Sequence, residues 1–279
     1  MSVPISFEVY PPREPEAAPA LYEAIDRLAE LSPDFISVTF GAGGSDTSGS
    51  IEVLSYIKSQ TQAVPLAHLT CVGTSELEAR ATIQQFLDAG ILDFLALRGD
   101  LPAGQTKLAS GSLASASELV GVIRSVATQP GAKVAVAAFP NGHPESGEER
   151  SDLLALKAKQ DAGADFAITQ LFFYAEDYFR FLELVRKAGV TIPIIPGIMP
   201  ISSGKRLARV LELTGEREPK ELAWALAQAS DAAARLELGI NWAADLVADL
   251  VSGGAPGIHL YAFNEYKNVT EVLRRAGLV

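Results

Sequence analysis

The chain has 279 residues, of which 48% are hydrophobic and 20% are charged, a composition typical of an ordinary globular protein. Its length is sufficient for one large domain or two small ones. The 34 acidic residues outnumber the 23 basic ones and give a net charge of −11, which opposes nucleic-acid binding because no basic patch interrupts the pattern.

Export and membrane insertion are not indicated. Cys71 is the single cysteine, so an internal disulfide is excluded, and the chain begins with a strand-like run instead of an export segment. No apolar run is long enough to span a membrane. We expect a cytoplasmic protein with small-molecule partners, and its oligomeric state stays open because exposed apolar patches cannot be told from helices that pack on a core.

Apolar strand-like runs alternate with helix-like segments along the chain. The runs expected to be strands are Ile5 to Tyr10, Phe35 to Phe40, Leu66 to Cys71, Phe94 to Leu97, Val134 to Phe139, Phe166 to Leu171, Ile192 to Pro196 and Ile258 to Phe263. The expected helices are Ala17 to Leu31, Ser48 to Ser59, Ser75 to Ala89, Ala116 to Thr128, Glu148 to Ala162, Glu176 to Ala188 and Val269 to Ala276. The period of roughly 30 residues is that of a βα unit.

Three predicted helices end in the dipeptide Ala-Gly, at Gly90, Gly163 and Gly189, and a strand follows each. Glycine suits the left-handed position just after a helix. Eight alternating units predict an α/β fold, the (β/α)8 TIM barrel. The alternative is a doubly wound open sheet, but no glycine-rich phosphate fingerprint follows the first strand, and the glycines of segment 41–44 are typical of a flexible turn after the second.

The longest gap between predicted strands runs from Ser202 to Pro256 and is rich in Leu, Ala, Glu and Arg. Pro219 is expected to start one helix within it, and the Gly253-Gly254 pair to end the last. We therefore expect extra helices between strands seven and eight, with residues 1–279 forming a single barrel domain.

One acidic residue lies inside the first predicted strand, which Pro11 and Pro12 end. This residue, Glu8, is costly to bury, so a largely desolvated carboxyl with a raised pKa is expected, able to donate a proton near neutral pH. The alternative is a carboxylate at an exposed strand edge or paired with Arg13.

Polar residues lie at or near the carboxyl ends of most predicted strands, where barrels of this kind carry their chemistry. They are Glu8, Thr39, His68, Thr70, Arg98, Asp100, His143, Thr169, Gln170, Tyr261 and Asn264. Any one of them could be a structural hydrogen-bonding group, and His68 alone is typical of a satisfied core histidine. Because so many share one rim, together they predict an active site.

The residue types disfavour several kinds of chemistry. His68, His143 and His259 come from different βα units, and Cys71 should face away from His68, so no metal site is predicted. No strand ends in a Schiff-base lysine, and no serine or cysteine accompanies a histidine at a nucleophile turn. Acid–base or hydride chemistry therefore remains as the chemistry expected at this site.

A series of segments carries a family resemblance. The segments are Ser6-Phe7-Glu8-Val9-Tyr10-Pro11-Pro12-Arg13, Val38-Thr39-Phe40-Gly41-Ala42, Ala67-His68-Leu69-Thr70-Cys71, Leu97-Arg98-Gly99-Asp100-Leu101-Pro102, His143-Pro144-Glu145, Asp161-Ala162-Gly163-Ala164-Asp165, Ile168-Thr169-Gln170-Leu171-Phe172-Phe173, Ile195-Pro196-Gly197-Ile198-Met199-Pro200 and His259-Leu260-Tyr261-Ala262-Phe263-Asn264. With these segments, in this order over nearly its whole length, the chain resembles the methylenetetrahydrofolate reductase family. So many separate matches make the resemblance specific.

The resemblance implies reduction of 5,10-methylenetetrahydrofolate to 5-methyltetrahydrofolate, with electrons from a nicotinamide nucleotide and FAD ordinarily relaying them. Glu8 matches the acid that protonates N10, so that the bridging ring opens to an N5 iminium cation. Asp100 would hold the pterin edge and favour the cation, while Gln170 matches a folate-binding glutamine and Thr39 is shared by substrate and cofactor. NADH is expected over NADPH by analogy with short relatives.

The flavin half of the implied site is partly altered. The residues that match flavin contacts are Thr39, His68, Arg98, Asp100, His143, Asp152 and Lys159. Phe139 and Ala114 stand where the family commonly has tyrosines, Ala155 replaces a polar residue of some relatives, and Gly204 falls where an aromatic often packs. Each change removes roughly 1 kcal/mol of binding or somewhat more. We expect direct hydride transfer without tightly bound flavin; the alternatives are an ordinary FAD relay and a non-catalytic folate-binding barrel.

Overall fold

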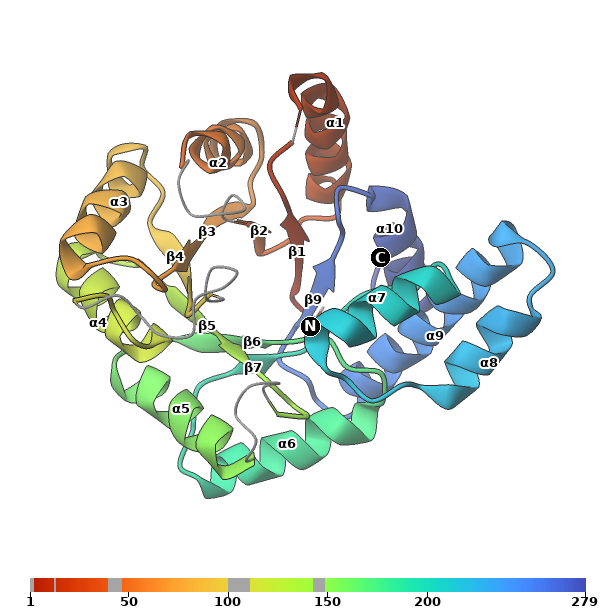
Figure 1. The fold of residues 1–279 in the computed structure, drawn as a ribbon. Coiled ribbons are helices and arrows are strands. Elements are labelled where there is room, and N and C mark those ends of the chain that lie inside the picture. Colours follow the sequence, from red (N-terminus) through yellow and green to blue (C-terminus); the bar gives the residue numbers. More distant parts are fainter. Residues whose placement is uncertain (1–2, 13, 40–46, 100–110, 143–148) are drawn as a thin grey trace.

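The computed structural model describes residues 3–12, 14–39, 47–99, 111–142 and 149–279, and its strands form a parallel barrel surrounded by helices (Figure 1). The strands are β1 (Ile5–Val9), β2 (Phe35–Val38), β3 (Val64–Thr70), β4 (Asp93–Leu97), β5 (Val134–Ala138), β6 (Phe166–Thr169), β7 (Ile194–Ile195), β8 (Gly197–Ile198) and β9 (Ile258–Tyr261). They are ordered β7-β6-β5-β4-β3-β2-β1-β9-β8. The predicted (β/α)8 barrel is confirmed.

The seventh predicted strand is divided in two. β7 pairs with β6 and β8 pairs with β9, so the two short strands complete the wall between the sixth and the last strand. Pro196 separates them and has no N–H to donate, although its carbonyl oxygen accepts from the His259 amide at 2.9 Å. The seventh strand was predicted as one run from Ile192 to Pro196. It is instead two short strands, one before and one after the proline.

The helices follow their predicted segments within a few residues. They are α1 (Ala18–Ala29), preceded by a 3-10 turn at Pro15–Ala17, α2 (Ser48–Gln60), α3 (Glu76–Asp88), α4 (Ala116–Val126), α5 (Glu149–Asp161), α6 (Ala175–Lys187) and α10 (Tyr266–Arg275). Gly90, Gly163 and Gly189 take the predicted left-handed backbone, with φ of 74°, 112° and 83°. Local sequence signals thus set where these helices stop.

The long gap before the last strand forms α7 (Gly204–Thr214), α8 (Lys220–Gln228) and α9 (Ala232–Ser252), which confirms the extra helices. Ser203 and Asp231 cap α7 and α9 by accepting backbone N–H groups. In Figure 1, α7 and α8 extend to one side of the ring, and the carboxyl end of α7 reaches the barrel mouth, where Leu213 and Thr214 line its cavities.

The core has three parts, one of which joins α7 and α8 to the ends of β6 and β8 through residues such as Phe173, Met199 and Leu207. Outward-facing strand residues pack against the surrounding helices, while inward-facing residues fill the lower barrel. The inner group comprises Phe35, Leu66, Leu95, Ala135 and Ile168. It forms an apolar floor beneath the polar residues of the mouth. Within the described ranges, no helix is long and apolar enough to cross a membrane.

Candidate active site

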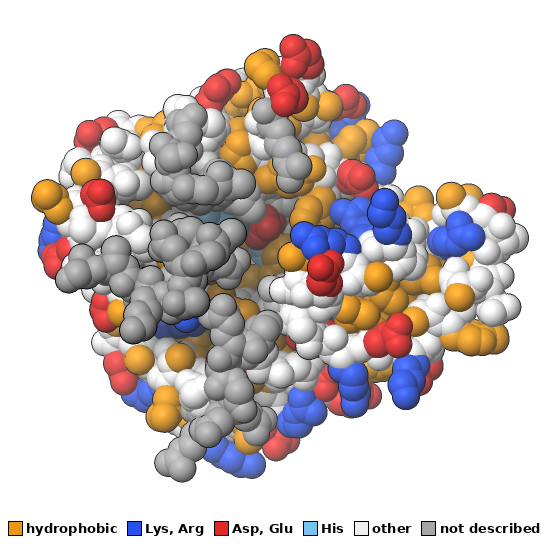
Figure 2. Space-filling model, viewed as in Figure 1, with side chains coloured by type: hydrophobic (Ala, Val, Ile, Leu, Met, Phe, Trp, Pro, Cys, Tyr) orange, Lys and Arg blue, Asp and Glu red, His pale blue; other side chains and the backbone are white. Residues whose placement is uncertain are grey.

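The barrel mouth holds a cavity of about 380 Å³ that brings together five of the polar residues predicted to share the rim: Glu8, Thr39, His68, Gln170 and Tyr261. Glu8 points inward from β1, and its strand neighbours in register are Ser37 on β2 and Tyr261 on β9. Its side chain is 18% exposed, so the carboxylate is partly buried yet accessible from the cavity. Figure 2 shows acidic and histidine atoms in a hollow near the centre of this face.

Two buried imidazoles flank the Glu8 carboxylate. The Nε2 atoms of His68 and His259 lie 3.6 Å and 4.0 Å from Glu8 Oε2. Neither Nε2 has a hydrogen-bond partner among the described residues. On its other side, His259 Nδ1 lies 2.9 Å from the Ser6 hydroxyl oxygen. A buried polar nitrogen without a partner is costly, so the two Nε2 atoms are placed to meet a polar group of a ligand.

The imidazoles change the protonation expected of Glu8. Burial raises the pKa of the Glu8 carboxyl, but His259 and His68 together lower it by more, so the pKa lies below its ordinary value. The predicted raised pKa is therefore wrong, because the strand pattern reveals burial but not the two histidines. Burial also lowers the pKa of His68, against the opposing effect of the Glu8 charge. At neutral pH the resting site holds a Glu8 carboxylate beside a neutral His68.

A second cavity of about 840 Å³ adjoins the first on the side of β4, β5, α4 and α5. The two share a wall made by Leu97, Ala137, Phe139, Gln170, Leu213 and Thr214. Three more predicted residues, Arg98, Asp152 and Lys159, line the second cavity. A ligand could therefore extend from these charged groups towards Glu8 without leaving the barrel mouth.

Lys159 supplies a cation to the second cavity. Its ammonium donates a hydrogen bond to the Ala137 carbonyl oxygen at 2.8 Å and lies 5.9 Å from the Phe139 ring centroid. Burial lowers its pKa to about 8, although the Asp152 charge acts in the opposite direction. A lysine so placed is charged at neutral pH and suited to an anionic group such as a phosphate.

The four residues that depart from the family pattern occupy different places. Phe139 lines both cavities and Ala155 lines the second, so both alter the pocket itself. Ala114 precedes α4, and its amide donates to Glu118 at 2.8 Å. Gly204 begins α7, and a Cβ built there would meet no described atom within 4 Å. Arg98, Asp152 and Lys159 supply charge to the second cavity, whereas Phe139 and Ala155 carry no polar side-chain atom.

Two predicted residues, Asp100 and His143, lie outside the described residues. Two others are structural: the Thr169 hydroxyl accepts from the Gly197 amide at 2.9 Å, and the Tyr261 hydroxyl donates to the Thr169 carbonyl at 2.7 Å. Sequence reasoning assigned no role to Ser6 and His259. Their signal was present, since Ser6 alternates with Glu8, and a closed barrel places the last strand beside the first.

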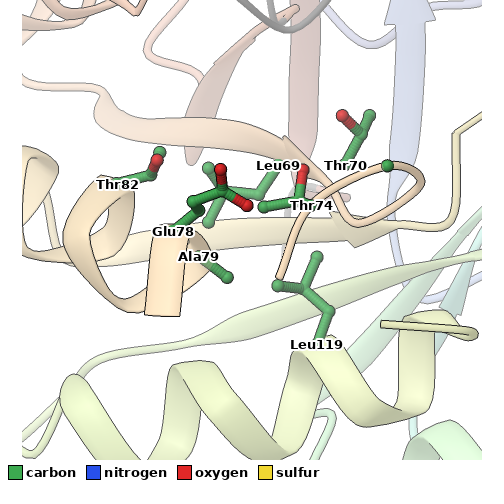
Figure 3. A pocket seen from close by; sticks show the side chains of 8 residues that line it. Leu69, Thr70, Thr74, Glu78, Ala79, Thr82 and Leu119 are labelled. Atoms are coloured by element: carbon green, nitrogen blue, oxygen red, sulfur yellow. The ribbon is translucent and has the colours of Figure 1, made fainter. Parts of the chain in front are cut away.

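A third cavity, of about 270 Å³, lies between β3, α3 and α4; of the predicted rim residues it contains Thr70, which is thereby separated from Glu8 (Figure 3). Its most polar member, Glu78, accepts hydrogen bonds from the Ser75 amide and hydroxyl and so caps α3. This carboxylate therefore stabilises the amino end of α3. Across the described residues, no group of three or more His, Cys, Asp or Glu is arranged to hold a metal ion.

Comparison with known proteins finds a matching protein family and similar individual proteins. The family model described as methylenetetrahydrofolate reductase matches residues 1–277. A 5,10-methylenetetrahydrofolate reductase from Escherichia coli is 39% identical over 265 residues, covering 93% of this chain and 86% of that protein. Arabidopsis thaliana methylenetetrahydrofolate reductase (NADH) 1 is 34% identical over 98% of this chain, which matches 48% of the plant protein.

Among solved structures, the chain is similar to a Clostridium thermocellum protein that binds two copies of 5-methyl-5,6,7,8-tetrahydrofolic acid. The TM-score is 0.67 at 17% identity, and the match covers 99% of this chain and 94% of that one. At this identity the likeness concerns the fold alone. It supports the barrel architecture described above.

Proposed function

This chain belongs to the methylenetetrahydrofolate reductase family, and from that membership we propose that it reduces 5,10-methylenetetrahydrofolate to 5-methyltetrahydrofolate with NADH. The observation that carries the proposal is the Glu8 carboxylate between two buried imidazoles, in one cavity with Gln170. A protein that only binds folate has no need of so costly an arrangement at its barrel mouth.

The chemistry requires one proton and one hydride. Protonation of N10 breaks its bond to the bridging carbon and leaves an N5 iminium, whose carbon then accepts the hydride and becomes the methyl group. In this proposal Glu8 donates the proton. Folate that enters the cavity displaces water from the carboxylate, which raises its pKa, so that Glu8 takes up a proton from solvent before it protonates N10.

Gln170 is suited to orient the folate. Its side-chain oxygen accepts a hydrogen bond from the Leu171 backbone N–H at 2.9 Å, which fixes the rotation of the Gln170 side-chain amide. The side-chain nitrogen meets no acceptor among the described residues and can donate to the pterin ring. Thr39 lines the same cavity. We assign to Asp100 the pterin edge, where its negative charge would favour the iminium.

The second cavity is proposed to take the nucleotide, with Lys159 and Arg98 near its phosphates. Its charged residues also suit FAD, which would supply a two-electron relay between NADH and folate, and this is the alternative reading. Two observations favour direct hydride transfer: Phe139 has no hydroxyl, and Ala155 has no polar atom to offer a flavin ring. Both residues line the pocket.

We expect protein purified without added cofactor to lack stoichiometric FAD and still reduce methylenetetrahydrofolate with NADH. The absorption spectrum measures the flavin, and NADH oxidation measures turnover. Direct transfer needs both substrates in one ternary complex, so double-reciprocal plots should intersect, whereas a flavin relay gives parallel lines. Active yellow protein whose activity disappears when flavin is stripped and returns on its addition would establish the relay; protein inactive with or without FAD would remove the reductase proposal.

The affinity for NADH is expected to fall as pH rises through about 8, where Lys159 loses its charge. The loss of a charge-assisted hydrogen bond should weaken binding by about tenfold. Isothermal titration from about pH 6.5 to 9.5 measures this, because the diphosphate of NADH keeps its charge over that range. Lys159→Met should bind weakly and independently of pH. An unchanged slope in this variant would assign the pH dependence to another group.

A further inference from the structure

A single amide side chain connects the turn after β5 to α6 and to the end of α7. Asn141 Nδ2 donates hydrogen bonds to Glu216 Oε2 at 2.7 Å and to Asp177 Oδ2 at 3.2 Å. Asn141 Oδ1 accepts a hydrogen bond from Arg180 Nη2 at 2.7 Å. These contacts, which we call the Asn141 bridge, use both N–H groups and the oxygen of the amide. An amide suits this place because it joins two carboxylates and a guanidinium without adding a charge.

The carboxylates of the bridge are partly withdrawn from water. Asp177 is 8% exposed and lies in the first turn of α6, where the helix dipole favours its charge, and Arg180 approaches it to 3.2 Å. Burial raises the pKa of the Glu216 carboxyl, against the opposing effect of its hydrogen bond from Asn141. Buried carboxylates need donors, so the loss of the Asn141 N–H groups would cost more than the loss of an exposed hydrogen bond.

Each end of the Asn141 bridge leads to a residue that lines the cavities. On one side, the Glu216 backbone N–H donates to the Thr214 hydroxyl oxygen at 3.3 Å. On the other side, the Gly142 backbone N–H donates to the Phe139 carbonyl oxygen at 3.2 Å, which closes a tight turn around Asn141. Thr214 and Phe139 both belong to the wall that the first and second cavities share. The bridge therefore ties a wall residue of α7 to a wall residue that follows β5.

Apolar packing anchors the middle of α7 better than its last turn. Leu207 and Val210 are buried in the part of the core that joins α7 and α8 to the barrel. Leu213, in the last turn, lines both cavities but is 61% exposed, so its burial does little to hold that turn. The chain leaves α7 through Gly215, which has a left-handed backbone with φ of 69°. The Asn141 bridge attaches directly after this residue and supplies a polar anchor there.

We propose that Asn141 is a positioning residue that sets the passage between the two cavities, an inference that rests on the proposed function. In that function, nicotinamide in the second cavity and folate in the first exchange a hydride where the cavities join. The reacting atoms must approach to about 3–3.5 Å, and a displacement of about 1 Å can cost about a hundredfold in rate. Asn141 itself lines neither cavity and acts through Phe139 and Thr214. Its loss should therefore slow the hydride step more than it weakens binding.

Asn141→Asp keeps the shape of the side chain, removes both N–H donors and places a third carboxylate beside Asp177 and Glu216. Stopped-flow oxidation of NADH, with both substrates saturating, should become about tenfold slower. Calorimetry should find the Kd of NADH and that of 5-methyltetrahydrofolate, each measured alone, within about twofold of the wild type. Asn241→Asp is the matched control with an unchanged rate, because it adds the same charge at an exposed site on α9 and keeps an acceptor for Arg275.

Glu216→Gln tests whether the bridge itself carries the effect. Alone, this variant should stay within about threefold of the wild-type rate, because its amide oxygen still accepts from Asn141. Combined with Asn141→Asp, its new N–H groups can donate to the new carboxylate, so the double variant should also return to within about threefold of the wild type. A general loss of stability caused at residue 141 would not be repaired in this way.

Thermal melting checks the fold of each variant. If Asn141→Asp melts early, Glu216→Ala decides, because it removes only the α7 side of the bridge; its hydride step should also be about tenfold slower, with both Kd values within about twofold of the wild type.

The outcomes separate this inference from the function beneath it. A wild-type protein that neither binds nor reduces methylenetetrahydrofolate would end the proposed function. An active wild type whose Asn141→Asp and Glu216→Ala variants transfer hydride within about twofold of its rate would overturn the positioning role alone. A double variant as slow as Asn141→Asp would overturn it too, and so would a loss of affinity as large as the loss of rate, which would make Asn141 a binding residue.

Discussion

Replacement of Glu8 by glutamine is expected to lower the turnover of methylenetetrahydrofolate by about 10²- to 10⁴-fold, the usual contribution of a general acid. Glutamine keeps the shape of the side chain but cannot deliver a proton to N10. The cavity around residue 8 would be unchanged, so 5-methyltetrahydrofolate should bind with an affinity close to that of the wild type. The loss should appear in kcat much more than in KM.

Steady-state kinetics with calorimetry on the same preparation tests this expectation. Glu183→Gln is a suitable control, because Glu183 is an exposed carboxylate on α6, remote from the cavity residues. Turnover of Glu8→Gln within a few-fold of the wild type would remove Glu8 from the mechanism. Loss of folate binding together with turnover would instead make Glu8 a binding residue.

Substitution of Gly239 by alanine is expected to destabilise the fold by about 3 kcal/mol or more, at the upper end of overpacking effects. Gly239 lies inside α9, and a Cβ built on it would overlap the backbone carbonyl oxygen of Ile201. Backbone cannot rotate away as a flexible side chain can. Either α9 or the segment that leads from β8 to α7 must therefore shift.

Urea denaturation measures the free energy of unfolding of this variant. Gly121→Ala is the matched control, since Gly121 lies within α4 and no described atom is within 4 Å of its built Cβ. Helix propensity alone should make this second variant more stable by roughly 0.5–1 kcal/mol. A Gly239→Ala protein as stable as the control would show that α9 has room against Ile201.

The barrel itself could be predicted from the sequence, because its signals are local. Each strand buries a short apolar run such as Val134–Ala138, and each helix that ends in Ala-Gly stops where Gly90, Gly163 or Gly189 takes a left-handed backbone. The break in the seventh strand was not predicted. Pro196 was placed at the end of that strand, and the hydrogen bond from the His259 amide to the Pro196 carbonyl oxygen forms only when the barrel closes.

The candidate site was predictable as a set of residue types and less so as an electrostatic environment. Their position at the carboxyl ends of predicted barrel strands grouped Glu8, Thr39, His68 and Gln170, which share one cavity. Phe263, which lines the same cavity, received no role from its strand pattern. The local sequence pattern around a residue does not reveal which residues lie near it across the barrel mouth.

The clearest division concerns the pKa of Glu8. The amino-acid pattern shows that a carboxylate lies in an apolar strand, and hence that it is desolvated, because burial follows from strand periodicity. The direction of the pKa shift depends instead on how the strands are arranged in space. Closure of the barrel pairs β1 with β9, which brings the imidazole of His259 to 4.0 Å from the carboxylate, while β3 brings His68 to 3.6 Å. The electrostatic interaction between these groups acts over a few ångströms in space, and separation along the chain carries no record of that distance.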